Sequence, residues 1–279
     1  MKIVAQMLVR NEADVILECL DEIARWGIEE IVVVDGASDD GTIEIVSAYC
    51  KADIDLHSSP DPAGRFKDHR RNELLKWTRR HNPDWVLSVD ADEIYHTDPT
   101  IAIEVAEEVG ANVVRCMVPQ FWITVADVRG GLVVEDTSLS VQKRRRWYSW
   151  GHMGTFIWKE NPDHFYPRDV QKRTPELPHQ DWREWQRAVR ALPICKHYPF
   201  RSLEQAVERS RLRRERGGRK YFGKYFENWI VDEEACDLTW FDGQVWNTMK
   251  INHHLVGEYM GHRPEVRGAR VRVAVGGEA

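Results

Sequence analysis

Two carboxylates stand two residues apart directly after an apolar segment. Asp90 and Asp92 follow residues 85–89, whose sequence Trp-Val-Leu-Ser-Val favours a buried strand. At the end of such a strand both carboxylates can face one pocket, and carboxylate oxygens are ligands that Mg²⁺ or Mn²⁺ shares with phosphates. An isolated D-x-D tripeptide is common in solvated acidic turns. Its position after a buried strand is what favours a divalent metal site here.

Polar turns also follow two earlier apolar segments, at residues 10–14 and 35–42, and each turn precedes a segment with helical spacing of its apolar residues. We expect Asn11 or Asp14 to cap the first of these helices. The expected strands are 3–9, 31–34, 54–57, 85–89 and 112–118, and the expected helices are 15–26, 43–50, 68–80 and 101–109. This alternation predicts an α/β fold with a mostly parallel, Rossmann-like sheet, helices on both faces, and ligands at the carboxyl ends of the strands.

The alternation stops beyond residue 118. Residues 120–178 are rich in Trp, Gly, Pro and charge, and they predict loops with a small mixed sheet that includes β-like stretches at 132–134 and 139–142. Residues 202–216 predict a helix. The expected organisation is a donor-binding half at 1–118, an acceptor-side and metal-completing region of the same domain at 119–265, and a flexible tail at 266–279.

The composition is that of a globular protein, with 42% hydrophobic and 30% charged residues in a chain of 279. The sequence has no apolar run of the roughly 20 residues that a membrane span needs and no signal-peptide pattern, so a cytoplasmic location is expected. A net charge of −6 argues against nucleic acid as a partner. The basic run at 209–220 is interpreted either as a solvated helix face or as a patch for peripheral contact with anionic lipid or a phosphorylated acceptor. The basic run at 143–146 is interpreted either as an exposed strand or as a diphosphate clamp.

The first hundred residues resemble the inverting GT-A glycosyltransferases of family two, through four motifs in the same order. Residues 8–12, Leu-Val-Arg-Asn-Glu, resemble the opening motif in its N-E variant, and residues 33–42 resemble the V-D-D-G-S-x-D-G-T segment. Arg71-Asn72 resembles the R-N pair, and residues 88–93 resemble L-D-A-D-E. The resemblance implies a nucleotide-diphosphate sugar as donor, a Mn²⁺ or Mg²⁺ ion, and a hydroxyl acceptor on a carbohydrate or glycoconjugate.

The resemblance also implies site residues. The nucleoside would be held by Leu8, Arg10, Asn11 and Asp35, the pyrophosphate by Arg71, the ribose or sugar by Asp90, and the metal by Asp90 and Asp92. These residue types suit the roles, because a guanidinium matches phosphate oxygens in a fork and a metal neutralises the leaving diphosphate. Relatives often carry a second acid where this chain has Gly36, which leaves the nucleobase open.

The second half resembles the family less closely. Residues 197–205 resemble an H-Y-x-x-R-S-x-E-Q segment in which a histidine completes the metal site, so His197 is either a metal ligand or a histidine packed at a helix start. The glutamate of the V-H-E motif is absent, because residues 151–153 are Gly-His-Met. The candidates for the catalytic base are therefore Asp136, His152 and Asp181, and Asp136 is preferred because acids after the D-x-D motif fill this role in relatives.

The sequence thus predicts an inverting, metal-dependent glycosyltransferase. A nucleotidyltransferase is an alternative with a similar sheet, but it would be expected to carry a glycine-rich phosphate loop after the first strand, and residues 9–14 contain no glycine. The other alternative is a catalytically silent carbohydrate-binding or scaffold protein of the same fold, which the missing V-H-E glutamate would favour.

Overall fold

The computed structural model describes residues 1–59, 69–131, 139–163, 193–215, 230–231, 234 and 239–240. The chain divides into two compact units. The first contains residues 1–117 and 153–196, and the second contains residues 118–152 and 197–279. None of the described helices combines the length and the apolar character that a membrane span requires.

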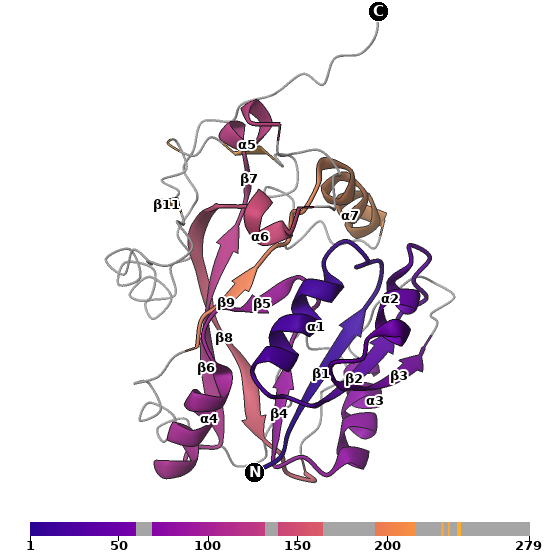
Figure 1. The fold of residues 1–279 in the computed structure, drawn as a ribbon, viewed down its shortest axis with the longest axis vertical. Helices are drawn as coiled ribbons and strands as arrows, with labels where there is room; N and C mark the ends of the chain where they lie inside the picture. Colours follow the sequence, from indigo (N-terminus) through magenta and orange to yellow (C-terminus); the bar gives the residue numbers. More distant parts are fainter. Residues whose placement is uncertain are drawn as a thin grey trace, which may run out of the picture. The chain divides into compact units, whose positions relative to one another are not determined.

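The first unit is built on the predicted alternation of strands and helices (Figure 1). Its elements are β1 (Ile3–Val9), α1 (Ile16–Arg25), β2 (Glu30–Asp35), α2 (Thr42–Ala48), β3 (Asp53–Ser58), α3 (His69–Thr78), the 3₁₀ helix η1 (Arg79–His81), β4 (Trp85–Ser88), β5 (Glu93–Tyr95) and α4 (Pro99–Glu108). Three strands, β6 (Val113–Phe121), β8 (Trp147–Lys159) and β9 (Cys195–His197), contribute to both units. The expected α/β fold with a mostly parallel sheet is confirmed.

The strand order of the sheet is β3-β2-β1-β4-β8-β6-β9-β5. Strand β1 pairs in parallel with β2 on one side, where Val9 is in register with Asp35, and with β4 on the other, where Gln6 is in register with Ser88. The chain therefore reverses its direction of travel across the sheet between β1 and β4, which is the kind of switch point where open α/β sheets bind ligands. The long strand β8, which sequence analysis did not predict, pairs antiparallel with β4.

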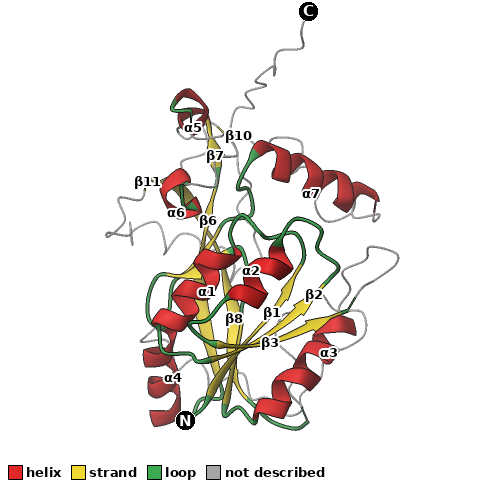
Figure 2. Cartoon of the chain, turned by 45° about the vertical axis from the view of Figure 1, so that its right-hand side comes forward, coloured by secondary structure: helices red, strands yellow, loops and turns green. Residues whose placement is uncertain are grey.

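Helices cover both faces of this part of the sheet. Helix α3 packs Leu74 against Val4, Val32 and Val34, which alternate along β1 and β2 as residues on one face of a strand do. Helices α1 and α2 lie on the opposite face (Figures 1 and 2). The buried side of α1 consists of Ile16, Cys19, Leu20 and Ile23.

The predicted cap of α1 is wrong. The residue before the helix is Val15, which makes no side-chain capping bond, and the first turn is closed by the Glu12 carbonyl, which accepts from the Ile16 N–H at 2.8 Å. Asn11 does not cap the helix because its amide is hydrogen-bonded to Asp39 in the loop after β2.

The second unit adds short elements to its parts of β6, β8 and β9. They are β7 (Ile123–Thr124), α5 (Val125–Arg129), α6 (Val141–Arg144), α7 (Leu203–Glu215), β10 (Ile230–Val231) and β11 (Thr239–Trp240). The helix predicted at 202–216 is confirmed as α7. The strand predicted at 139–142 is wrong, because Ser140 accepts from the Lys143 N–H and begins the short helix α6. Residues 132–134 and the tail at 266–279 lie outside the described residues.

Part of the motif at 197–205 serves to begin α7. The Ser202 hydroxyl accepts from the Gln205 N–H at 3.1 Å, and the Gln205 side chain accepts from the Arg201 N–H at 3.2 Å. These bonds satisfy backbone donors at the start of the helix that have no partner within it. The R-S-x-E-Q part of the motif therefore has a structural explanation.

Two buried arginines of the second unit bind backbone carbonyls. Arg145 donates through Nε to the Phe200 carbonyl at 3.3 Å, through Nη2 to the Arg201 carbonyl at 2.5 Å and through Nη1 to the Arg144 carbonyl at 2.9 Å. Arg144 donates to the carbonyls of Leu139 and Arg201. Burial lowers the pKa of Arg145 to about 10, although the nearby Asp127 carboxylate opposes this shift. The segments at 139–145 and 200–201 are thereby joined. The exposed strand predicted at 143–146 is wrong, because helix α6 ends there and both arginines are buried.

Gly154 in β8 is buried beneath the ring of Phe156, its neighbour on the same face of the strand. A Cβ at position 154 would overlap this ring. We therefore expect Gly154→Ala to lower the free energy of unfolding by about 1–3 kcal/mol, which is the usual cost of adding a carbon atom to a well-packed core. Urea denaturation measures the change. The variant Phe156→Leu in the Gly154→Ala background should recover part of the loss, and an unchanged midpoint for Gly154→Ala alone would contradict the packing.

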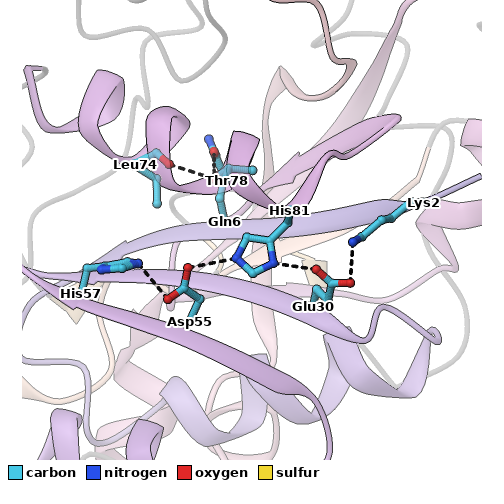
Figure 3. A network of polar contacts seen from close by, with 8 residues as sticks. All are labelled: Lys2, Gln6, Glu30, Asp55, His57, Leu74, Thr78 and His81. Atoms are coloured by element: carbon cyan, nitrogen blue, oxygen red, sulfur yellow. Dashed lines mark hydrogen bonds and ion pairs between the residues drawn. The ribbon is translucent and has the colours of Figure 1, made fainter.

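A charged network joins Lys2, which directly precedes β1, to β2, β3 and η1 on the α3 face of the sheet (Figure 3). The His81 ring lies between two carboxylates, with Nδ1 2.6 Å from Glu30 and Nε2 2.9 Å from Asp55. Lys2 pairs with Glu30 at 2.7 Å, and His57 pairs with Asp55 at 2.8 Å while it stacks on Trp77. The network fixes the start of β2 to β3 and to the segment that leads into β4.

The stability of the first unit should depend on the protonation of this network. Burial by itself would lower the pKa of His81, but hydrogen bonds to Asp55 and Glu30 outweigh it and raise the pKa above the ordinary value. A raised folded-state pKa means that the stabilisation is complete below the unfolded pKa of about 6.5 and is lost as the pH rises through the folded pKa.

We therefore expect the urea midpoint of the wild-type protein to fall as the pH rises above about 6.5. His81→Gln should flatten this part of the profile, because the substituted residue cannot take up the proton. Equal slopes in the two proteins would contradict the role of His81. Below about pH 4 both proteins should lose stability, since hydrogen bonds hold the pKa values of Glu30 and Asp55 below their ordinary values against the effect of burial.

Candidate functional site

Three loops of the first unit meet at the carboxyl edge of the sheet. Residues 10–14 follow β1, residues 36–41 follow β2, and residues 89–92 follow β4. The parallel register places the ends of these strands together, since Val9 is paired with Asp35 and the Val89 N–H donates to the Gln6 carbonyl at 3.1 Å. Arg10, Asn11 and Asp90, which are predicted to bind the donor, thus lie in loops along one edge, on both sides of the switch point between β1 and β4.

Asp35 ends β2, and only 1% of its surface is exposed. Its carboxylate accepts from the Ala37 N–H at 2.9 Å, from the Ser38 N–H at 3.1 Å and from the Ser38 hydroxyl at 2.5 Å. Ala37 has φ 66°, a left-handed conformation that non-glycine residues seldom adopt. The acid therefore organises the loop that follows it.

The loops after β1 and β2 are joined by side-chain hydrogen bonds. The Asn11 amide donates to Asp39 at 2.8 Å and accepts from the Asp39 N–H at 3.1 Å. Closer to α2, the Asp40 carboxylate accepts from the Ala13 N–H at 3.0 Å, and the Thr42 hydroxyl accepts from the Glu12 N–H at 2.9 Å. The two loops form one connected surface at the edge of the sheet.

The acidic turn after β4 is braced from the α1 side. Within the turn, Glu93 accepts from the Asp90 N–H at 3.1 Å, and the Asp90 carbonyl accepts from the Glu93 N–H at 2.9 Å. The buried Cys19 thiol of α1 lies 3.2 Å from the Glu93 carbonyl and 3.7 Å from the Asp90 carbonyl. Burial, and then the charges of Glu93, Asp92 and Asp90, raise the pKa of this thiol well above its ordinary value. Cys19 is thus a protonated donor that supports the turn.

The donor set of this turn fits a divalent cation that is shared with a substrate. Asp90 is half-buried, whereas Asp92 is 2% exposed. Among the described residues, no group of three or more His, Cys, Asp or Glu side chains is arranged to hold a metal. Mg²⁺ and similar ions in phosphate-transfer sites are commonly held by one or two carboxylates together with substrate phosphates and water, so a two-carboxylate turn suits this chemistry.

The other residues that were predicted to bind the nucleotide sugar lie in different environments in the first unit. Leu8 packs against the core cluster under α3, so its side chain serves the sheet. Arg10 is half-buried in the loop after β1, and Arg71 is half-buried in the first turn of α3. Residues 60–68, which precede α3, lie outside the described residues.

The predicted acceptor-side residues belong elsewhere. His197 ends β9 in the second unit, is half-buried and is in register with Gln120. His152 lies in β8, where only its backbone is described. Asp136 and Asp181, the other candidates for a catalytic base, lie outside the described residues.

Several residues that support the three loops of the site were not identified from the sequence. Cys19 is not among the site residues predicted from the sequence, and Ser38, Asp39 and Asp40 enter that prediction only as parts of the motif at residues 33–42. The signal for Cys19 was its place on the apolar stripe of α1, which must face the sheet. For the loop residues no periodicity exists, because their partners lie in another loop about 27 to 30 residues away.

Comparison with known proteins finds a family similarity in the N-terminal part of the chain. Residues 6–122 match the family model described as glycosyl transferase family 2, a range that includes all three loops of the site. No curated protein sequence matches the chain.

Several solved structures are similar in part. The S. aureus TarS 1-349 structure in complex with UDP-GlcNAc is 26% identical over 43% of this chain and 34% of that chain, with a TM-score of 0.34. The mannosyltransferase PcManGT from Pyrobaculum calidifontis, in complex with GDP-Man and Mn²⁺, is 19% identical over 81% of this chain and 64% of that chain, with a TM-score of 0.42. The chain spans less than two thirds of each of these proteins. Because the TM-scores are low, the similarity to glycosyltransferases rests on the family model, which matches residues 6–122.

Proposed function

We propose that this protein transfers a sugar from a nucleoside diphosphate donor to a hydroxyl acceptor on a carbohydrate or glycoconjugate, with inversion at the anomeric carbon. The main support for the proposal is that the loops after β1, β2 and β4 lie at the same edge of the sheet. All three loops belong to residues 6–122, which match the family model. Their polar groups suit a nucleoside diphosphate, because N–H donors and carboxylates bind base and ribose while a cation and Arg71 neutralise phosphate charge.

Asp90 and Asp92 would hold Mn²⁺ or Mg²⁺, which supplies charge neutralisation for the departing diphosphate. Asp35 keeps the loop after β2 in shape for the nucleoside, and the Cys19 and Glu93 contacts keep the acidic turn in place. The acceptor hydroxyl needs a base on the face of the sugar opposite the diphosphate. Asp136 and His152 as this base, and His197 as a further metal ligand, stay predictions from the sequence.

Thermal unfolding with nucleotides tests the proposal. UDP, GDP and dTDP are added separately, each with and without Mn²⁺, and UDP and GDP are included because the two similar structures hold UDP-GlcNAc and GDP-Man. We expect one nucleotide to raise the midpoint, and to do so more strongly with Mn²⁺, because a ligand that binds only the folded protein stabilises it. No metal-dependent stabilisation by any nucleotide would contradict the donor assignment.

Turnover is measured separately. The assay follows release of nucleoside diphosphate from the matching nucleotide sugar. We expect slow release without an acceptor and faster release when simple sugar acceptors are added. Stabilisation by a nucleotide sugar without any release of diphosphate would instead favour the catalytically silent binding protein.

A further inference from the structure

Two exposed side chains hold the tips of the donor loops together. The Asn11 amide uses both of its functional groups on one partner, since Nδ2 donates to Asp39 Oδ1 at 2.8 Å and its oxygen accepts from the Asp39 N–H at 3.1 Å. A reciprocal pair of this kind fixes both the distance and the relative orientation of the two loops. It also occupies the Asn11 amide, which the sequence had assigned to the nucleoside.

A second link connects this pair to the buried acid at the end of β2. The Asn11 N–H donates to the Ser38 hydroxyl at 3.0 Å, and that hydroxyl donates to Asp35 at 2.5 Å. Ser38 therefore links the backbone of Asn11 to the Asp35 carboxylate. Both oxygens of the Asp35 carboxylate accept bonds from its own loop, so the shape of this loop and the place of Asn11 depend on each other.

The backbone at both loops is held in a conformation that it would not adopt unaided. Asn11 has φ 55° and Ala37 has φ 66°. A left-handed conformation is unfavourable for a non-glycine residue, somewhat less so for Asn, and it persists where surrounding contacts impose it. Strained positions of this kind often occur where a loop is shaped for a ligand.

We propose that Asn11 and Asp39 form a positioning pair that sets the spacing of the donor loops, so that both residues act on nucleotide affinity without touching the nucleotide. The inference rests on the proposed function, since it assumes that the donor binds at these loops. The Asp40 and Thr42 bonds join the loops nearer to α2 independently of the pair, so losing the pair would loosen only the outer part of the loops.

The test is a double-mutant cycle on the full chain. Asp39→Ala, Asn11→Ala and the double variant are compared with the wild type in calorimetric titrations with the nucleoside diphosphate that gives the largest thermal shift, in the presence of Mn²⁺. We expect each single substitution to weaken binding by about fivefold to tenfold, and the double variant to bind no more weakly than the weaker single one, since both remove the same interaction.

Two further variants separate positioning from charge and from stability. Asp39→Asn keeps the acceptor oxygen and the N–H, so it should bind within about twofold of the wild type. Glu44→Ala removes a negative charge from an exposed position of the neighbouring helix α2 and should leave affinity unchanged. In steady-state transfer, Asp39→Ala should raise KM for the donor and leave kcat nearly constant. Asp39→Ala, Asp39→Asn and Glu44→Ala should unfold at nearly the wild-type midpoint, because these positions are exposed. The variants that carry Asn11→Ala should unfold at a somewhat lower midpoint, since alanine adopts a φ of 55° less readily than asparagine.

The outcomes are distinguishable. If the wild type binds no nucleotide, the proposed function itself fails. If the wild type binds and Asp39→Ala binds equally well, the positioning role is overturned. If the two single effects multiply in the double variant, Asn11 and Asp39 act separately, which also overturns the pair.

Discussion

Asp92→Asn is expected to abolish sugar transfer while the protein stays folded. The substitution keeps the size of a side chain that is only 2% exposed, but it removes the negative charge that would hold the cation against the donor diphosphate. A metal ion contributes several kcal/mol of charge stabilisation to such reactions, so kcat/KM should fall by at least about a hundredfold. Release of nucleoside diphosphate from the donor measures the loss.

The matched control for this prediction is Asp53→Asn, which makes the same chemical change at an exposed position at the start of β3. It should transfer sugar at the wild-type rate. Asp92→Asn should also lose the stabilisation that a nucleoside diphosphate gives with Mn²⁺, and should unfold near the wild-type midpoint without ligand. Full activity in Asp92→Asn would remove this residue from the metal site.

Arg145→Met is expected to destabilise the second unit by about 3 kcal/mol. Arg145 is fully buried, and its guanidinium donates to the carbonyls of Phe200, Arg201 and Arg144. The Arg201 carbonyl keeps its bond from Arg144, but the carbonyls of Phe200 and Arg144 each lose the Arg145 donor. The loss of a donor to a buried carbonyl costs about 1–3 kcal/mol, and part of the total is regained because a charged group no longer has to be buried. Urea denaturation followed by tryptophan fluorescence measures the change.

Lys143→Met serves as its control, because it removes a positive charge from an exposed side chain of the same helix. We expect its urea midpoint to match the wild type. If the two variants unfolded at the same midpoint, the buried guanidinium would not be what joins residues 139–145 to residues 200–201.

Apart from β5 and η1, the strands and helices of residues 1–118 were predictable because their apolar residues recur with a strong period. The run at 31–34 and the alternating contacts of Val4 and Val32 with Leu74 follow directly from burial on a sheet. The cap of α1 was not predictable, because Asn11 has a stronger partner in Asp39, and nothing local in the sequence shows that competition.

The second half was harder to predict because its structure depends on non-local contacts. Residues 139–142 carry β-like residues, yet Ser140 and the buried arginines next to it make a helical turn. Strand β8 was missed since its glycines and tryptophans show no alternation, although Phe156 and Gly154 fit together on one face. In the candidate site, the sequence motifs pointed to Asp35, Asp90 and Asp92, whereas the supporting contacts of Cys19 and Ser38 could not be predicted.

The first unit is discontinuous in sequence, and this matters for its synthesis. The ribosome completes β1 to β4 early, but the neighbour that covers the outer side of β4 is β8, through residues 157–159. Until that segment emerges, the nascent chain presents β4 as an open edge with unpaired backbone groups, which is a template for aggregation. A nascent or truncated chain that ends before residue 157 would therefore need a chaperone to shield β4, even though every residue of the three donor loops had already been made.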